Sequence, residues 1–249
     1  MTFRKQKIAR ALIFTSILLL ICQMLPAKGK SENFIIGKKV VLKSKILGED
    51  RLVYIGLPQH YQYEGTRYPV LYVLDGNSHF IHALGTTSAI NGPRYIVVAI
   101  TNTNRNRDFT PTENKKWGET GGADNFLRFM KEELFPYVEK NYRTAEYRTL
   151  YGHSLCGMFA IYTLFNQARM FDSYIAISPY LQWDNQYILK TAKNRDLSIL
   201  KNRHLFITLG DEPDYKPSIA KFQDLMKSKN PSGFRWEYRN YPKESHVTL

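Results

Sequence analysis

Ser154 stands where a strand pattern gives way to a helix pattern. Residues 148–151 form a short β-prone run, the serine lies among small residues, and residues 158–165 have an apolar helical pattern. A strand, an abrupt turn and a helix, with serine at the turn, are typical of a nucleophile elbow, in which a strained backbone lifts the hydroxyl above a sheet. The pattern predicts a nucleophilic serine. The alternative is an ordinary Gly-Ser turn that joins a strand to a helix.

The motif around the serine departs from Gly-x-Ser-x-Gly at one position. Gly152 is in place, but Cys156 occupies the position of the second glycine, and Gly157 comes one residue later. Small residues are needed there so that strand and helix can approach each other closely. Because cysteine is small, the substitution weakens the motif without removing the prediction.

A base and an acid are also required, because a serine hydroxyl is a poor nucleophile until a histidine takes its proton and an acid orients that histidine. His246 lies in a loop after the last expected strand and is the candidate base. Asp211, Glu212 and Asp214 follow the strand expected at residues 205–209. Each of them fits the role of the acid as well as that of a solvated loop charge. His153, beside the serine, is expected to pack inside the elbow.

Backbone N–H donors must receive the negative charge that develops on an attacked carbonyl oxygen. Leu155 follows the serine directly and is expected to supply one donor. Gly76 and Asn77 follow the buried strand expected at residues 70–74, so their backbone is expected to supply the second. For Gly76 the simpler alternative is a tight turn after a strand.

The connection at residues 102–122 is long and rich in Asn, Arg, Thr and Gly. Long connections in compact domains are often functional. Arg105 and Arg107 lie in this segment and are candidates for recognising an anionic substrate. The solubility of an exposed loop is the simpler explanation for each arginine taken alone.

Continuous apolar runs alternate with helical patterns along the chain. An antiparallel pair is expected first, at residues 35–46 and 51–57, and helices are expected at 123–137, 184–196 and 217–226. Apolar runs of this kind are typical of strands buried on both faces. The order predicts an α/β fold with a mostly parallel central sheet, helices on both faces and an antiparallel leading edge. The expected strands after the leading pair are residues 70–74, 95–100, 148–151, 174–177, 205–209 and 234–241.

The composition excludes several classes of protein. The 249 residues carry a formal net charge of +13, but four of the basic residues fall within the first ten positions. No block of five or more Lys or Arg and no nucleic-acid-binding motif accompanies the rest, so a solvated basic surface is expected and nucleic acid is not an expected partner. The two cysteines and six histidines show no metal-ligand spacing.

Residues 1–30 have the layout of an export signal or membrane anchor. A basic run precedes the uncharged residues 11–22, and residues 26–30 break the apolar stretch. The stretch is short for a membrane span. We therefore expect an exported protein, periplasmic, secreted or membrane-anchored. Cleavage near Ala27, lipidation at Cys22 and uncleaved anchoring remain alternatives.

Taken together, residues 34–249 resemble the Putative esterase (esterase D-like) family of the α/β-hydrolases, which includes enterobactin-type siderophore esterases. The resemblance is carried by the serine motif together with residues 68–76, 102–103, 107–112, 176–179 and 241–246. It implies ester hydrolysis with Ser154 as nucleophile and His246 as base, and it places the acid on Glu212. It implies no cofactor and a small-molecule ester as substrate.

Two departures from that family leave other functions open. Cys156 replaces the usual glycine, and the chain stops three residues after His246, where family members continue into a closing helix. A domain shortened at its C-terminus is therefore an expectation. A catalytically weak or inactive binding protein and an acyltransferase on the same fold are the alternatives to an esterase.

Overall fold

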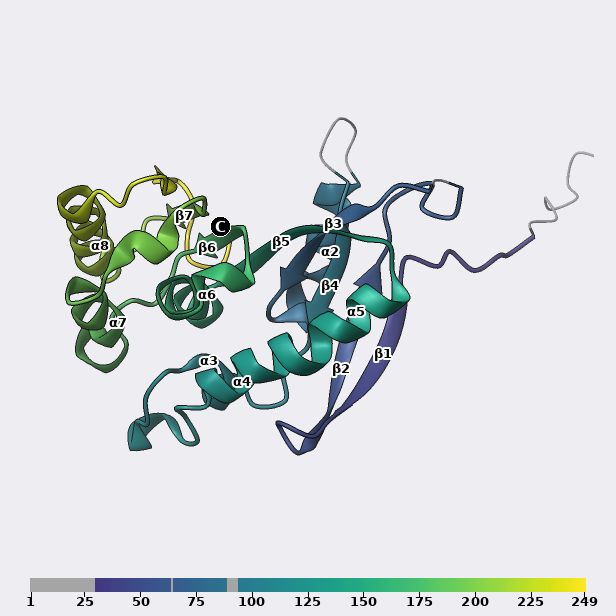
Figure 1. The fold of residues 1–249 in the computed structure, drawn as a ribbon, viewed down its shortest axis with the longest axis horizontal. Coiled ribbons are helices and arrows are strands. Elements are labelled where there is room, and N and C mark those ends of the chain that lie inside the picture. The colour runs from purple at the N-terminus through teal and green to yellow at the C-terminus, as the bar shows by residue number, and fades with distance from the viewer. Residues whose placement is uncertain (1–29, 64, 89–93) are drawn as a thin grey trace, which may run out of the picture. The chain divides into compact units, whose positions relative to one another are not determined.

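The computed structural model describes residues 30–63, 65–88 and 94–249 (Figure 1). Gly37–Leu249 forms a compact unit of its own. The expected export signal lies outside the described residues, except for residue 30. Within the described ranges, no helix is both long and apolar enough to cross a membrane.

The strands of the described chain form one eight-stranded sheet in the order β1-β2-β4-β3-β5-β6-β7-β8. The leading strands β1 and β2 pair antiparallel, β2 pairs antiparallel with β4, and every later pairing is parallel. The predicted fold class is confirmed (Figure 1). The strands are β1 (Lys38–Ser44), β2 (Glu49–Gly56), β3 (Tyr68–Val73), β4 (Ile96–Ile100), β5 (Thr144–His153), β6 (Ser173–Ile177), β7 (His204–Leu209) and β8 (Arg235–Asn240).

Helices connect the parallel strands, because two parallel strands need a crossover between them. The α-helices are α2 (Gly76–Thr87), α3 (Arg105–Phe109), α4 (Ala123–Phe129), α5 (Phe135–Asn141), α6 (Leu155–Asn166), α7 (Trp183–Lys193) and α8 (Lys216–Lys229). Short helical turns lie at Lys115–Trp117, Met130–Leu134, Ala168–Met170 and Leu197–Leu200.

Strand β3 shows why the sheet is covered on both faces. Successive side chains of a strand point to opposite faces. Leu71 and Val73 pack in one apolar cluster with Phe80 of α2. Tyr72 and Leu74 belong instead to the larger cluster, which holds the buried residues of α4 to α8. Because both faces are buried, the strand reads as the continuous apolar run seen in the sequence.

Three segments differ in detail from the sequence expectation. Helix α2 follows Asp75 directly, where only a turn was expected. The helix expected at residues 123–137 contains a π-helical turn, Met130–Leu134, and continues as α5. Pro136 lies in the first turn of α5 and has no N–H, so it cannot donate the regular hydrogen bond across this junction. The long connection at 102–122 contains α3.

A buried ion network ties that connection to β2. Arg51 is fully buried, donates to the Thr101 carbonyl over 3.2 Å, and pairs with Asp108 at 2.8 Å. It also pairs with Glu49, and Arg107 joins the same two carboxylates at 2.8 Å each. Burial raises the pKa of Asp108 despite both arginines. The network fixes α3 and the residues around it against the sheet.

Replacing Arg51 with methionine is expected to destabilise the protein by about 3–5 kcal/mol, because it leaves carboxylates without their buried partner. Urea unfolding at neutral pH measures this loss. Arg128→Met is the matched control, since Arg128 forms only an exposed i,i+4 pair with Glu132 at 3.5 Å. A loss no greater than that of the control would contradict the role assigned to Arg51.

Candidate active site

Ser154 occupies the junction between the end of β5 and the start of α6, with φ 60° and ψ −118°. A serine rarely adopts this backbone conformation, which is kept only where the surroundings enforce it. Its N–H donates to the Ile177 carbonyl over 2.9 Å, and its carbonyl accepts from Met158 and Tyr180 at 2.9 and 3.1 Å. These bonds to α6 and to the end of β6 hold the strained turn that the sequence pattern predicts.

The structure explains the imperfect glycine motif. A Cβ at Gly152 would lie 2.2 Å from the Cys156 carbonyl oxygen, so only glycine fits where strand and helix meet. A Cβ at Gly157 would lie 2.8 Å from the Ile177 carbonyl oxygen, so the second close approach is made by this residue. Cys156 is fully buried, with Sγ 3.9 Å from an Arg105 nitrogen. The cysteine therefore replaces a glycine at a position that has room for a side chain.

His246 lies between the serine and an acid. Its Nε2 is 2.9 Å from Ser154 Oγ, and its Nδ1 contacts Glu212 Oε1. With Nδ1–H donating to the carboxylate, Nε2 carries the lone pair that accepts the serine proton. The loop of His246 is fixed by hydrogen bonds to the end of β7: Tyr241 N–H donates to Leu209 over 2.8 Å, and Asp211 N–H donates to Glu244 over 2.7 Å.

Glu212 is the acid that reaches the histidine. Its side chain is buried and accepts from the Ser178 hydroxyl and, at 2.9 Å, from the Gly210 N–H. Burial alone would raise the pKa of Glu212, but these hydrogen bonds and His246 outweigh it, so the pKa is lowered. Asp211 is exposed and pairs with Lys216 at 3.0 Å.

The backbone donors expected for an oxyanion lie at two neighbouring helix starts. Leu74 N–H donates to the Tyr151 carbonyl over 3.0 Å, so the ends of β3 and β5 lie side by side. Helix α2 begins at Gly76, followed by Asn77, and α6 begins at Leu155. The first N–H groups of a helix have no partner within the helix, and they carry its positive dipole end.

Asp75 links the start of α2 to α3. Its backbone is left-handed, with φ 52°, and its carboxylate accepts from Arg105 Nε at 2.9 and 3.1 Å and Nη2 at 2.9 Å. Asn102 donates to the same carboxylate over 2.5 Å. Burial would raise the pKa of Asp75, but Arg105 and Asn102 outweigh it and the pKa is lowered. The ion pair fixes Arg105 beside the nucleophile turn, where Nη2 is 3.5 Å from the His153 carbonyl.

Arg107 has a different environment from Arg105. It is engaged by Glu49 and Asp108 in the buried network of β2, at 2.8 Å each. No hydrogen bond of the described chain joins it to the Ser154 region. The two arginines that the sequence could not distinguish therefore have different surroundings, and Arg105 is the one at the candidate site.

A row of aromatic side chains in successive contact borders His246. The Tyr215 ring lies 5.2 Å from His246, and Tyr180 lies 5.6 Å from Tyr215. Trp117 lies 6.3 Å from Tyr180 and 5.9 Å from Trp183, and half of its surface is exposed. Apolar ring faces therefore extend outward from the base.

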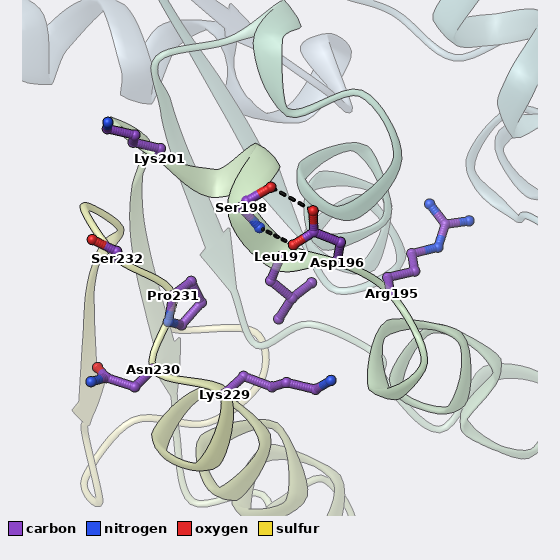
Figure 2. Close-up of a pocket in the computed structure, with 9 residues that line it drawn as sticks. All are labelled: Arg195, Asp196, Leu197, Ser198, Lys201, Lys229, Asn230, Pro231 and Ser232. Atoms are coloured by element: carbon purple, nitrogen blue, oxygen red, sulfur yellow. Dashed lines mark hydrogen bonds between the residues drawn. The ribbon is translucent and has the colours of Figure 1, made fainter.

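A separate hollow of about 430 Å³ lies between the turn after α7 and the end of α8 (Figure 2). Its lining includes Arg195, Lys201 and Lys229, and none of the sequence-predicted site residues. Among the described residues, no group of three or more His, Cys, Asp or Glu side chains is arranged to hold a metal ion.

Comparison with known proteins identifies the family. The family model "Putative esterase" matches residues 44–247. The chain belongs to this family. It is 28% identical over 215 residues to the ferri-bacillibactin esterase BesA of Bacillus subtilis, covering 73% of this chain and 74% of that protein. It is 32% identical over 197 residues to the siderophore triacetylfusarinine C esterase of Aspergillus fumigatus, covering 70% and 67%.

A solved structure agrees with the family. The IroE-like serine hydrolase from Shewanella oneidensis superposes with a TM-score of 0.77 at 29% identity, covering 85% of this chain and 75% of that one. Membership in the family supports ester hydrolysis, and the relatives named here act on small-molecule esters. The resemblance inferred from the sequence is confirmed.

The sequence alone assigns no role to Ser178, yet its hydroxyl donates to Glu212 in the site. His153 is predicted to pack inside the elbow, and its ring, 4.6 Å from that of His246, also contacts the candidate base. The position of Ser178 at the carboxyl end of a parallel strand is the one signal that could have drawn attention to it.

Proposed function

We propose that this protein is a serine carboxylester hydrolase that works through an acyl-enzyme intermediate. The observation that carries the proposal is the position of His246, with one ring nitrogen on Ser154 and the other on Glu212. This arrangement supplies the nucleophile, the base and the orienting acid in one connected line. The strained backbone of Ser154 supports it further.

The reaction follows from this geometry. His246 takes the Ser154 proton as Oγ attacks the ester carbonyl carbon, and the negative oxygen is received by the N–H groups of Leu155 and of Gly76 or Asn77. The tetrahedral intermediate collapses, His246 gives the proton to the leaving alcohol, and the acyl group remains on Ser154. Water then attacks this ester with His246 again as base, which releases the acid and restores the serine.

Ferric siderophore esters are the proposed substrates. Relatives from a bacterium and a fungus are named as siderophore esterases, and matching residues run through most of this chain. Arg105 is paired with Asp75 at the nucleophile turn, and its side chain is about one-third exposed. Guanidinium N–H groups that Asp75 does not use can donate to an anionic ligand such as an iron-loaded chelator.

The test combines a short p-nitrophenyl ester with an organophosphonate probe. The wild-type protein is expected to hydrolyse the ester and to carry one phosphonate on Ser154, located by peptide mass spectrometry. Product analysis with and without added alcohols separates hydrolysis from acyl transfer. The binding-protein alternative holds if purified protein neither turns over the ester nor reacts with the probe.

Arg105→Met is expected to lower kcat/KM for an anionic ester about tenfold more than for a neutral ester of the same size, because a charged hydrogen-bond donor to the substrate is lost. Arg107→Met is the matched control, since that side chain is engaged by Glu49 and Asp108. Steady-state kinetics on both esters gives the ratio. If Arg105→Met lowered kcat/KM equally on the two esters, or if Arg107→Met gave the same ratio, Arg105 would have no role in recognising the substrate.

Export is the proposed localisation. Its support is the basic and then uncharged apolar layout of residues 1–30. Fractionation of cells that produce the full chain tests it, with the expectation that activity appears outside the cytoplasm. Activity confined to the cytoplasmic fraction would reject export, and deletion of residues 1–30 should cause that confinement.

A further inference from the structure

Three histidine rings contact one another in a row beside the nucleophile. His79 lies on α2 with its ring 5.8 Å from that of His153, and His153 lies 4.6 Å from His246. The ring of His79 also meets Tyr151 at 5.6 Å. The Tyr215 ring also contacts His246, at 5.2 Å. The histidine next to Ser154 thus contacts both the helix of the expected oxyanion donors and the candidate base.

The hydrogen bonds of His246 alone do not fix its ring. Nδ1 faces Glu212 and Nε2 faces Ser154. These contacts hold the ring at its two nitrogens, and the His246 loop is largely exposed. The ring also packs against His153, inclined at 37°, and against Tyr215, inclined at 48°. Packing against these two rings limits how far the His246 ring can tilt.

We propose that His153 is a positioning residue for His246, holding its ring in the plane that keeps Nε2 aimed at the Ser154 hydroxyl. The inference rests on the proposed hydrolase function. His153 and Tyr215 form a clamp of two rings that pack against His246, and His79 contacts His153 from α2. Through these contacts, the helix that starts with Gly76 and Asn77 and the base are held in one arrangement.

The electrostatics of His153 suit this role. Burial, followed by the nearby charges of His246 and His79, lowers its pKa to about 4. His153 therefore stays neutral at the pH where histidine bases work, and a neutral ring does not repel His246 when that ring becomes an imidazolium. The Nε2 atom of His153 is buried and makes no hydrogen bond among the described residues. A hydrogen bond between the His153 side chain and the His246 backbone adds to the ring contact.

Two apolar substitutions of similar volume test whether position 153 needs a flat ring or only a side chain that fills the space. His153→Phe keeps a flat face against His246, whereas His153→Leu fills the site without one. We expect His153→Phe to retain kcat within about threefold of the wild type. We expect His153→Leu to lose about 10²-fold in kcat with little change in KM, as misplacement of a base by about 1 Å can cause. His82→Leu, on the exposed side of α2, is the control and should behave as wild type.

Phosphonate labelling of Ser154 gives a second readout, because its rate needs the same base but no substrate-specific contact. It should fall in His153→Leu in parallel with kcat, with circular dichroism and the melting temperature showing that each variant is folded. The clamp is rejected if His153→Leu keeps the wild-type kcat, or if His153→Phe loses as much as His153→Leu. If the wild type itself shows no Ser154-dependent turnover, the proposed function fails instead, so the two failures are distinguishable.

Discussion

Replacing Ser154 with alanine is expected to lower kcat for ester hydrolysis by at least about 10³-fold while KM changes little. The residual rate would come from the backbone N–H donors and from substrate binding, which remain when a serine nucleophile is removed. The melting temperature should not fall, because the Ser154 backbone bonds to Ile177, Met158 and Tyr180 need no side chain. Hydrolysis of a p-nitrophenyl ester by equal amounts of folded protein measures the loss.

Ser232→Ala is the matched control for this substitution. Ser232 is an exposed serine that lines the hollow between the turn after α7 and the end of α8, and we expect it to keep wild-type activity (Figure 2). If Ser154→Ala retained the wild-type rate and still reacted with the phosphonate, another residue would be the nucleophile. That result would also remove the reason for the strained backbone at Ser154.

The strands could be predicted because parallel strands buried on both faces have no polar alternation. Residues 70–74 and 95–100 are apolar for this reason, and the ends predicted for these strands fall within a residue or two of the observed strands. Helix α2 could not be predicted in the same way. Its sequence mixes glycines, histidines and threonines, and its first residue depends on the left-handed backbone of Asp75. That conformation is fixed by Asn102 and Arg105, which lie far along the chain.

The candidate site was likewise predictable from the sequence only in part. The chain order of serine, acid and histidine is readable from the sequence, and so is the small size of the residues around Ser154. The choice among Asp211, Glu212 and Asp214 is not readable from the pattern of residues, and only the family resemblance favours Glu212. It depends on which side chain turns into the protein and meets Ser178. The choice between Arg105 and Arg107 depends on whether the partner is Asp75 or Glu49. Sequence spacing contains no information about these distant partners.

Glu212→Gln is expected to lower kcat by up to about 10⁴-fold, with the site otherwise intact. The amide has nearly the shape of the carboxylate, but it removes the charge that stabilises the His246 imidazolium, and its N–H₂ group favours the wrong tautomer of that ring. Asp214→Asn is the control, because Asp214 is exposed. A Glu212→Gln enzyme with nearly full activity would show instead that His246 is held well enough without the acid.

The pH dependence of stability gives an independent check on Glu212. Its pKa in the folded protein is lowered, so the charged carboxylate stabilises the fold at pH values above the usual range for glutamate, and this contribution is lost as the pH falls through the lowered pKa. The wild type should therefore be more stable than Glu212→Gln at pH 7, and the difference should stay constant down to about pH 5 and shrink below about pH 4. Urea unfolding of both proteins across this range measures the difference. If the difference in the free energy of unfolding grew as the pH fell, the folded protein would favour the protonated form of Glu212. Glu212 would then lack the charge that the proposed mechanism needs to orient His246.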